Sequence, residues 1–217
     1  MISILRRSLL VLLASIPLWA NAAPATSAHD LVESTTKQLL ADLAANKQKY
    51  QSDPNAFYTS LNNIVGPAVD VDGISKSVMT VKYSRNATPQ QITQFSENFK
   101  RGLFQFYGNA LLEYNNQGIT VAPAKDESGD RTTVDMTVKG SGGAVYPVSY
   151  TLALINNEWK VRNVIINGIN LGKLFRDQFA DAMQRNGNDL QKTIDSWAGE
   201  VAKAKDASDN GTAKAAQ

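Results

Sequence analysis

The chain has 217 residues, and its 22 basic and 20 acidic side chains nearly balance. It has no cysteine and a single histidine, which excludes disulfides, thiol chemistry and histidine- or cysteine-rich metal sites, so no metal site is expected. The near-neutral charge argues against nucleic acid as a partner, and the length suffices for one domain with its own core.

Residues 1–22 have the features of a secretory signal peptide. Arg6 and Arg7 form a positive n-region, residues 9–19 a short apolar core, and residues 20–22 (Ala-Asn-Ala) a small-residue cleavage site. The apolar stretch is too short to span a bilayer comfortably. We expect a mature chain that begins at Ala23, carries 20 basic and 20 acidic residues and works outside the cytoplasm.

The first half of the mature chain has helical periodicity. Leu31, Leu39 and Leu43 recur at helical spacing up to Tyr50. Asp53 followed by proline is typical of an N-cap and a first helical residue, and predicts a second helix over Asn55–Val65. A short amphipathic helix is predicted over Ile74–Tyr83.

The helix with the clearest start begins at Thr88. Thr88 is a cap residue, Pro89 fits the first turn, and Gln91 completes a capping box. An apolar face then runs from Ile92 to Tyr114, and the helix is expected to end by Asn115-Asn116-Gln117-Gly118.

After Gly118 the apolar residues recur with a period of two. This pattern, with a glycine-rich turn at Gly140–Gly143, predicts an antiparallel meander that ends at Asn167-Gly168. Its four predicted strands are Ile119–Pro123, Thr132–Lys139, Tyr146–Leu154 and Glu158–Ile166.

Two helices are predicted after the sheet. The first covers Leu171–Asn186, and the second is capped by Asn188 with Gln191 and reaches Val201. The fold class is therefore α+β. The predicted organisation is a signal peptide at 1–22, one domain at 23–202 (helices 30–115, sheet 118–166, helices 168–202) and a disordered polar tail at 203–217.

Candidate catalytic groups are sparse. A Ser–His–Asp triad would have to use His29, which is expected to lie solvated in a poorly anchored N-terminus. The carboxylates are scattered among charged neighbours, without the surroundings that a general acid or base needs. No catalytic residue is assigned, and the chain is predicted not to be an enzyme.

The wide apolar stripes of the long helix, the strands and the Leu171 helix have two interpretations. Such stripes normally pack against one another as core. A cavity for an apolar ligand needs the same stripes held apart. The pattern of residues leaves both interpretations open.

Three stretches of the chain together resemble one family, the periplasmic phospholipid carriers of the Mla pathway (MlaC-type), also called toluene-tolerance auxiliary proteins, and the pseudomonad members above all. The resemblance runs from about Leu31 to Val201. Asn163 and Asn170 are departures, since many members have Asp and Ser there. The stretches are residues 81–91 (VKYSRNATPQQ), residues 95–111 with Phe95, Phe99 and Tyr107-Gly108-Asn109-Ala110-Leu111, and residues 159–179 with Trp159–Val164, Gly168–Leu171 and Arg176–Phe179.

The resemblance implies a fold and a function. The fold is a twisted four-stranded antiparallel sheet packed against several helices, NTF2-like with an added helical part, which encloses an apolar lipid pocket. The function is to shuttle phospholipids through the periplasm and so maintain outer-membrane lipid asymmetry and solvent tolerance. The implied partners are phospholipid, an inner-membrane MCE-domain/ABC transporter complex and an outer-membrane lipoprotein–porin complex. No cofactor is implied, and phospholipid is the transported ligand.

Candidate site residues follow from the stripes and the implied pocket. Basic side chains near the start of the long helix are candidates for docking a partner or a headgroup, or form an ordinary solvated face: Lys82, Arg85, Lys100 and Arg101. Apolar side chains predicted to contact the acyl tails, or else to be ordinary core, are Val134, Met136, Val138, Val148, Tyr150 and Leu152 on the sheet, with Phe95, Phe99, Leu103, Val161 and Ile165 facing them.

Three alternatives remain open. The first is a lipid-acting hydrolase or isomerase on a similar fold. The second is a structural or chaperone-like protein with a filled core. The third is direct binding of an aromatic solvent.

Overall fold

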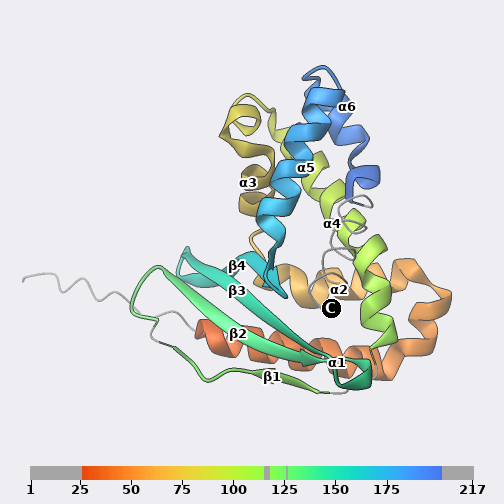
Figure 1. The fold of residues 1–217 in the computed structure, drawn as a ribbon, viewed down its shortest axis with the longest axis vertical. Coiled ribbons are helices and arrows are strands. Elements are labelled where there is room, and N and C mark those ends of the chain that lie inside the picture. The colour runs from red at the N-terminus through yellow and green to blue at the C-terminus, as the bar shows by residue number, and fades with distance from the viewer. Residues whose placement is uncertain (1–25, 115–117, 126, 202–217) are drawn as a thin grey trace, which may run out of the picture.

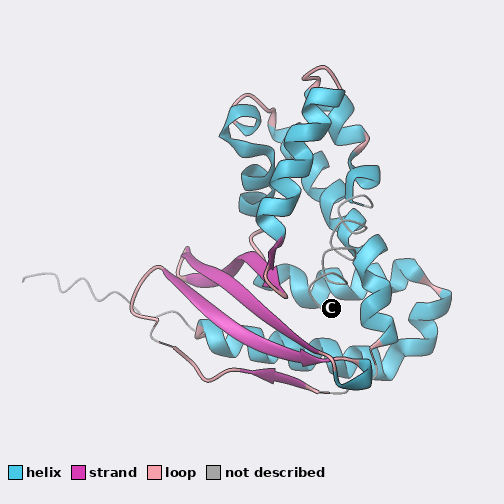
Figure 2. Ribbon diagram, viewed as in Figure 1, coloured by secondary structure: helices cyan, strands magenta, loops and turns pink. Residues whose placement is uncertain are grey.

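The computed structural model describes residues 26–114, 118–125 and 127–201, so the predicted signal peptide and polar tail lie outside the described residues. It confirms the predicted α+β class (Figures 1 and 2). The elements, in chain order, are α1 (Ala28–Ser52), α2 (Pro54–Val65), η1 (Gly66–Ala68), α3 (Val71–Ser84), α4 (Pro89–Glu113), β1 (Ile119–Val121), β2 (Arg131–Lys139), η2 (Ser141–Gly143), β3 (Val145–Ile155), β4 (Glu158–Ile166), β5 (Ile169–Asn170), α5 (Leu171–Arg185) and α6 (Leu190–Asp195).

The predicted helix starts are mostly confirmed. The Asp53 side chain accepts hydrogen bonds from two backbone N–H groups at the start of α2. At the start of α4, Gln91 N donates to Thr88 Oγ1 over 3.2 Å and Thr88 N donates to Gln91 Oε1 over 3.0 Å, which completes the capping box. The prediction that Asn188 caps the last helix is wrong, because Asp189 does so. Asn188 has φ 62° and belongs to the left-handed turn that ends α5.

Helix α3 is interrupted by one residue. Thr80 has φ 61° and ψ 160°, a conformation that is almost confined to glycine, and it divides the helix near its C-terminal end. The next residue, Val81, keeps 65% of its surface exposed. The C-terminal turn of α3 is thus turned away from the direction of the rest of the helix.

The sheet is an open antiparallel meander with the strand order β1-β2-β3-β4-β5. We predicted four strands that end at Asn167-Gly168. This prediction is wrong, because the sheet has five strands and continues beyond these two residues. Asn167 and Gly168 have φ 49° and 81°, and they turn the chain back so that the two residues of β5 pair with the end of β4. A strand of two residues is too short to give a periodic signal in the sequence.

A β-bulge in β4 changes which residues share a face. Leu152 pairs with Val161, but Thr151 pairs with Asn163, so Arg162 is an extra residue in β4. Beyond the bulge, the alternation of side chains is reversed relative to the first half of the strand.

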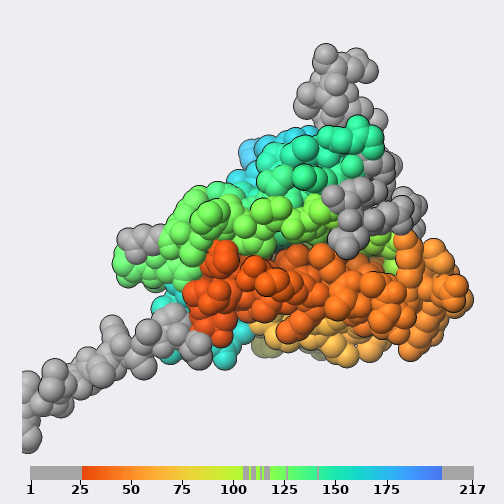
Figure 3. Space-filling model, turned by 90° about the horizontal axis from the view of Figure 1, so that it is seen from below, coloured from red at the N-terminus to blue at the C-terminus, as the bar shows by residue number. Residues whose placement is uncertain are grey.

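Helices meet the sheet at two places. Helix α1 crosses below the sheet in Figure 1, and in the view from below in Figure 3 it runs along the face turned toward the viewer. It contacts β1, β2 and β4, and α3 and α5 also contact β4. Together with α6 and part of α4, α3 and α5 form a helical bundle above the sheet (Figure 1).

Within the described residues, the buried apolar side chains form three separate clusters. A domain of this size usually has one contiguous core. The first cluster, here called the bundle cluster, joins Val78, Met79, Ile92, Phe95, Phe99, Phe175, Phe179, Met183, Ile194, Trp197 and Val201. The second, the sheet cluster, joins Ala28, Val32, Val134, Leu152, Trp159 and Val161. The third joins Leu43, Tyr50, Phe57 and Leu61. No described helix is long and apolar enough to cross a membrane.

Candidate apolar binding site

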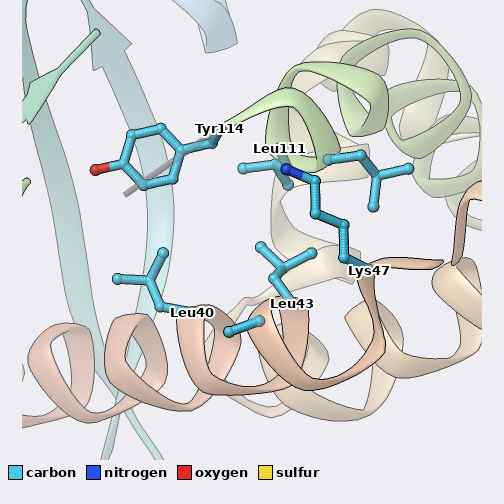
Figure 4. A pocket seen from close by; sticks show the side chains of 7 residues that line it. Leu40, Leu43, Lys47, Leu111 and Tyr114 are labelled. Atoms are coloured by element: carbon cyan, nitrogen blue, oxygen red, sulfur yellow. The ribbon is translucent and has the colours of Figure 1, made fainter. Parts of the chain in front are cut away.

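A pocket of about 230 Å³ lies between α1 and the C-terminal end of α4. In Figure 4, side chains from both helices converge on it, with Leu40, Leu43 and Lys47 on α1 opposite Leu111 and Tyr114. The three α1 residues recur at helical spacing and therefore lie on one face of that helix. Most of the lining is apolar, so the pocket suits hydrocarbon.

The wall at the end of α4 is held to the sheet through Tyr114. The Tyr114 hydroxyl accepts a hydrogen bond from Gly118 N over 2.9 Å, and Gly118 O accepts one from Lys139 N over 2.9 Å. Lys139 pairs with Val145, which begins β3. The pocket therefore lies near the β2–β3 hairpin, where Val145 and Tyr146 are 56% and 40% exposed.

A second pocket, of about 120 Å³, separates the bundle cluster from the edge of the sheet. Phe99 and Leu103 of α4 line it from one side and Val164 of β4 from another. Its polar lining is confined to three residues, of which Lys100 pairs with Glu97 over 2.6 Å. The other lining residues are Val69, Val71, Ile74, Val78, Arg162, Asn163, Leu171, Gly172 and Phe175.

The two polar bulge residues at this second pocket attach helices to the sheet. Arg162 forms an ion pair with Asp70, the N-cap of α3. Asn163 Oδ1 accepts a hydrogen bond from Gly172 N in the first turn of α5 over 3.0 Å. The bulge thus fixes the starts of two helices of the bundle and leaves an apolar space between them and α4.

The predicted sheet residues share one face. Val134 pairs with Tyr150 and Met136 with Val148, so the inward positions of β2 and β3 lie side by side. Their burial differs along the face. Val134, Leu152 and Val161 are closed off by the start of α1 in the sheet cluster. Met136 and Val148 are also buried, whereas Val138 and Tyr150 are only half-buried. Burial thus decreases at the hairpin end, at Val138 and Tyr146, and also at Tyr150, which lies between the buried Val148 and Leu152.

The Tyr150 side chain has an apolar environment but keeps part of its surface exposed to solvent. Burial raises the pKa of its hydroxyl to about 12, because the phenolate would lose its hydration. Nevertheless the residue is half-buried rather than buried. It packs against the sheet cluster and keeps part of its surface accessible.

Two predicted tail contacts lie away from this face. The Phe95 ring centroid is 5.2 Å from that of Phe179 and 5.1 Å from that of Trp197, so Phe95 is fully enclosed in the bundle cluster. Ile165 pairs with Ser149, whose hydroxyl donates to Asp135 on the polar face of the sheet. The bulge at Arg162 is the reason that Ile165 is not on the face of Val161.

The basic residues Lys82, Arg85, Lys100 and Arg101 do not form one patch. Lys82 and Arg85 lie at the end of α3, while Lys100 follows the cap of α4 by 12 residues, about 18 Å along the helix. Lys82 and Arg101 each lie 4.7 Å from a tyrosine ring centroid, those of Tyr83 and Tyr58. The four residues therefore form two separate pairs, Lys82 and Arg85 at the end of α3, and Lys100 and Arg101 in the middle of α4.

His29 is better anchored than predicted. The backbone N–H groups of Ala28 and His29 donate to the Glu127 carboxylate, which fixes the start of α1. Among the described residues, the His29 ring pairs with Asp30, whose carboxylate lies 3.4 Å from Nδ1. No described hydroxyl is paired with the imidazole, so a nucleophile–base pair is absent from this part of the chain.

Sequence reasoning missed most of the lining of the larger pocket. Leu40 and Leu43 belong to the apolar stripe of the first helix, but that helix carries more than one apolar side. Its first turns close the sheet cluster, and its later turns line the pocket. The apolar residues of this helix shift from one side to another along its length. That shift was the feature of the sequence that could have revealed the second apolar side.

The geometry can be compared with known proteins. The family model "MlaC protein" matches residues 33–199. The toluene tolerance protein ttg2D of Pseudomonas putida is 71% identical over 214 residues, which cover 99% of both chains. The chain belongs to the MlaC family.

Two more distant proteins extend the MlaC comparison. The intermembrane phospholipid transport system binding protein MlaC of Haemophilus influenzae is 25% identical over 184 residues, 82% of this chain and 77% of that protein. A solved structure of a phospholipid-binding protein from Ralstonia solanacearum, in complex with a phospholipid, matches with a TM-score of 0.74 and 22% identity over 82% of this chain and 99% of that chain. The latter likeness confirms the fold expected from the resemblance, with five strands instead of four.

Proposed function

We propose that this MlaC-family chain is a periplasmic phospholipid carrier whose acyl tails lie in the apolar space between the sheet, α1 and α4. It moves lipid between an outer-membrane lipoprotein–porin complex and an inner-membrane MCE-domain/ABC transporter complex, and so maintains the asymmetry of the outer membrane. The observation that carries the proposal is the division of the core into separate clusters, with one mainly apolar pocket between the bundle cluster and the sheet and another beside the third cluster. The phospholipid in the related solved structure supports it.

The energetics of transfer suit a site without catalytic groups. Two acyl tails of roughly 30 methylenes would gain about 24 kcal/mol on leaving water, at about 0.8 kcal/mol each, which is more than noncovalent affinity reaches in practice. A lipid taken from a bilayer has dry tails already. The carrier therefore needs only to offer the tails an environment as apolar as the interior of the bilayer. Release of the lipid then depends on the partner.

The lipid-bound state is expected to be wider than this one. Pockets for drug-sized ligands measure about 300–1,000 Å³. The two pockets measure about 230 and 120 Å³, less than that range. Loading two tails therefore requires their walls to separate. Candidate contacts are Leu40 and Leu103 from the pockets and the half-buried Val138 and Tyr150 of the sheet.

Native mass spectrometry tests the proposal. The mature protein purified from the periplasm should carry phospholipid in a fixed ratio, identified by extraction of the same sample. Leu40→Gln and Leu103→Gln place an amide against the tails, and at a cost of ~1–3 kcal/mol they should lower lipid occupancy at least fivefold. Val81→Gln is the matched control, since Val81 is 65% exposed on α3 and lines neither pocket.

Two outcomes would contradict the proposal. Wild-type protein that stays free of lipid after incubation with phospholipid vesicles would mean that the clusters are ordinary core. Release of fatty acid from added phospholipid would indicate a lipid hydrolase instead. Circular dichroism of each variant separates loss of lipid from loss of fold.

A further inference from the structure

The Tyr150 hydroxyl has no protein partner among the described residues. Its neighbours across the strands are Val134 on β2 and Val164 on β4, which offer no hydrogen-bonding side chain. The described polar side-chain atoms that are both sealed and unpaired are the indole nitrogens of Trp159 and Trp197. The Tyr150 hydroxyl is not one of these sealed atoms, so it remains accessible.

The geometry of the sheet directs this hydroxyl into the proposed tail space. Side chains of a strand stand roughly perpendicular to the sheet. A tyrosine is longer than the valine on either side of it, so its hydroxyl extends beyond both. Val164, its neighbour on the same face, lines the pocket between the sheet and the bundle. Tyr150 does not itself line this pocket, so its hydroxyl lies beside the pocket on the same face of the sheet, where it remains accessible to a ligand.

A buried tyrosine hydroxyl usually finds a hydrogen-bond partner, because leaving it unpaired in an apolar environment is unfavourable. A phospholipid has acceptors at its phosphate and at its two ester carbonyls. The ester carbonyls are the acceptors attached directly to the tails, and so they enter an apolar site while the headgroup stays outside.

We propose that the Tyr150 hydroxyl donates a hydrogen bond to an ester carbonyl oxygen of the bound phospholipid. This inference rests on the carrier function proposed above. It makes Tyr150 a positioning residue that fixes how deep the tails enter, and it predicts that the protein prefers ester-linked to ether-linked lipids. The raised pKa is consistent with this role, because the phenol stays protonated and remains a donor.

Tyr150→Phe is the direct test, since it removes the hydroxyl and keeps the ring. Wild-type protein is offered an equimolar mixture of diacyl and dialkyl phosphatidylcholine with chains of equal length, in vesicles, and the bound lipids are counted by native mass spectrometry. We expect a preference of about tenfold for the diacyl lipid, equivalent to about 1.4 kcal/mol. In Tyr150→Phe the preference should fall to near unity.

Tyr83→Phe is the matched control. Tyr83 belongs to α3 and packs against Phe179, and its hydroxyl lies 3.4 Å from Asn188, away from the sheet. This variant should keep the wild-type preference. The infrared band of the ester carbonyl of bound lipid gives a second readout, and it should move to the frequency of a free ester in Tyr150→Phe alone.

The outcomes separate the two proposals. Equal uptake of both lipids by wild-type protein, or an unchanged preference in Tyr150→Phe, overturns the role of Tyr150 and leaves the carrier function standing. Failure of wild-type protein to take up either lipid overturns the carrier function and the role of Tyr150 with it.

Discussion

Replacing Thr80 by glycine should stabilise the protein. Thr80 has φ 61° and ψ 160°, a region that β-branched residues avoid, at a cost of about 1–3 kcal/mol. Glycine adopts this conformation freely, but its greater freedom in the unfolded chain costs roughly 0.5–1 kcal/mol. The net gain in the free energy of unfolding is therefore about 1 kcal/mol, which for a domain of this size raises Tm by about 2–4 °C.

Urea denaturation and thermal unfolding of Thr80→Gly measure this gain. Ser77→Gly is the control in the same helix, because Ser77 is exposed and lies in the regular part of α3. There glycine should cost about 0.5–1 kcal/mol. If the free energy of unfolding rises in Thr80→Gly and falls in Ser77→Gly, the result would support backbone strain at the kink. A loss of stability in Thr80→Gly equal to that in Ser77→Gly would refute the reasoning.

Two further predictions concern the proposed site and its supports. Tyr150 has a folded-state pKa of about 12 against an ordinary 10.0, so its contribution to stability is complete below about pH 10 and is lost as pH rises through 12. The free energy of unfolding, measured by urea titration at a series of alkaline pH values, should therefore fall less steeply in Tyr150→Phe than in wild-type protein. Equal slopes would contradict the dry environment. A Cβ at Gly73 would clash with Asp70 Oδ2 and Arg162 Nη1, the ends of two flexible side chains, so Gly73→Ala should displace the partly exposed Asp70–Arg162 ion pair and lower stability by about 0.2–1 kcal/mol. Gly66→Ala, where the nearest atom lies at 3.7 Å, should change little, and a similar loss at both positions in urea denaturation would argue against a special role of the ion pair.

Local signals in the sequence predicted most of the elements. The capping box at Thr88 and the proline after Asp53 act within a few residues, and both helix starts are confirmed. The errors arose where a single residue changes the local pattern. Asn188 is a good cap residue, but the turn after Gly187 needs it in a left-handed conformation, which moves the cap to Asp189.

The candidate site was harder to predict, because a period of two cannot reveal a bulge. Val161 and Ile165 are four residues apart and would share a face in a regular strand. The extra residue, Arg162, reverses the alternation: it places Val164 beside Tyr150, where a regular strand would place Asn163, and it moves Ile165 from Val148 to Ser149. What holds the bulge is nonlocal, namely the ion pair with Asp70 and the hydrogen bond from Gly172 to Asn163. Neither contact is visible in the spacing of apolar residues.

The apolar stripes of this chain are used for both core and cavity, and the structure divides the two roles in space. The bundle cluster is almost fully enclosed, with Phe95, Phe179 and Trp197 in mutual ring contact. Truncation there should cost about 3–5 kcal/mol, as for any large buried ring. The sheet face near the hairpin is half-buried, so substitutions there remove fewer contacts. A carrier needs such a division, since a site that must open and close cannot also supply most of the stability. Along α4, Phe95 is enclosed in the bundle cluster, Phe99 one turn further belongs to that cluster and also lines the smaller pocket, and Leu103 after another turn lines the pocket.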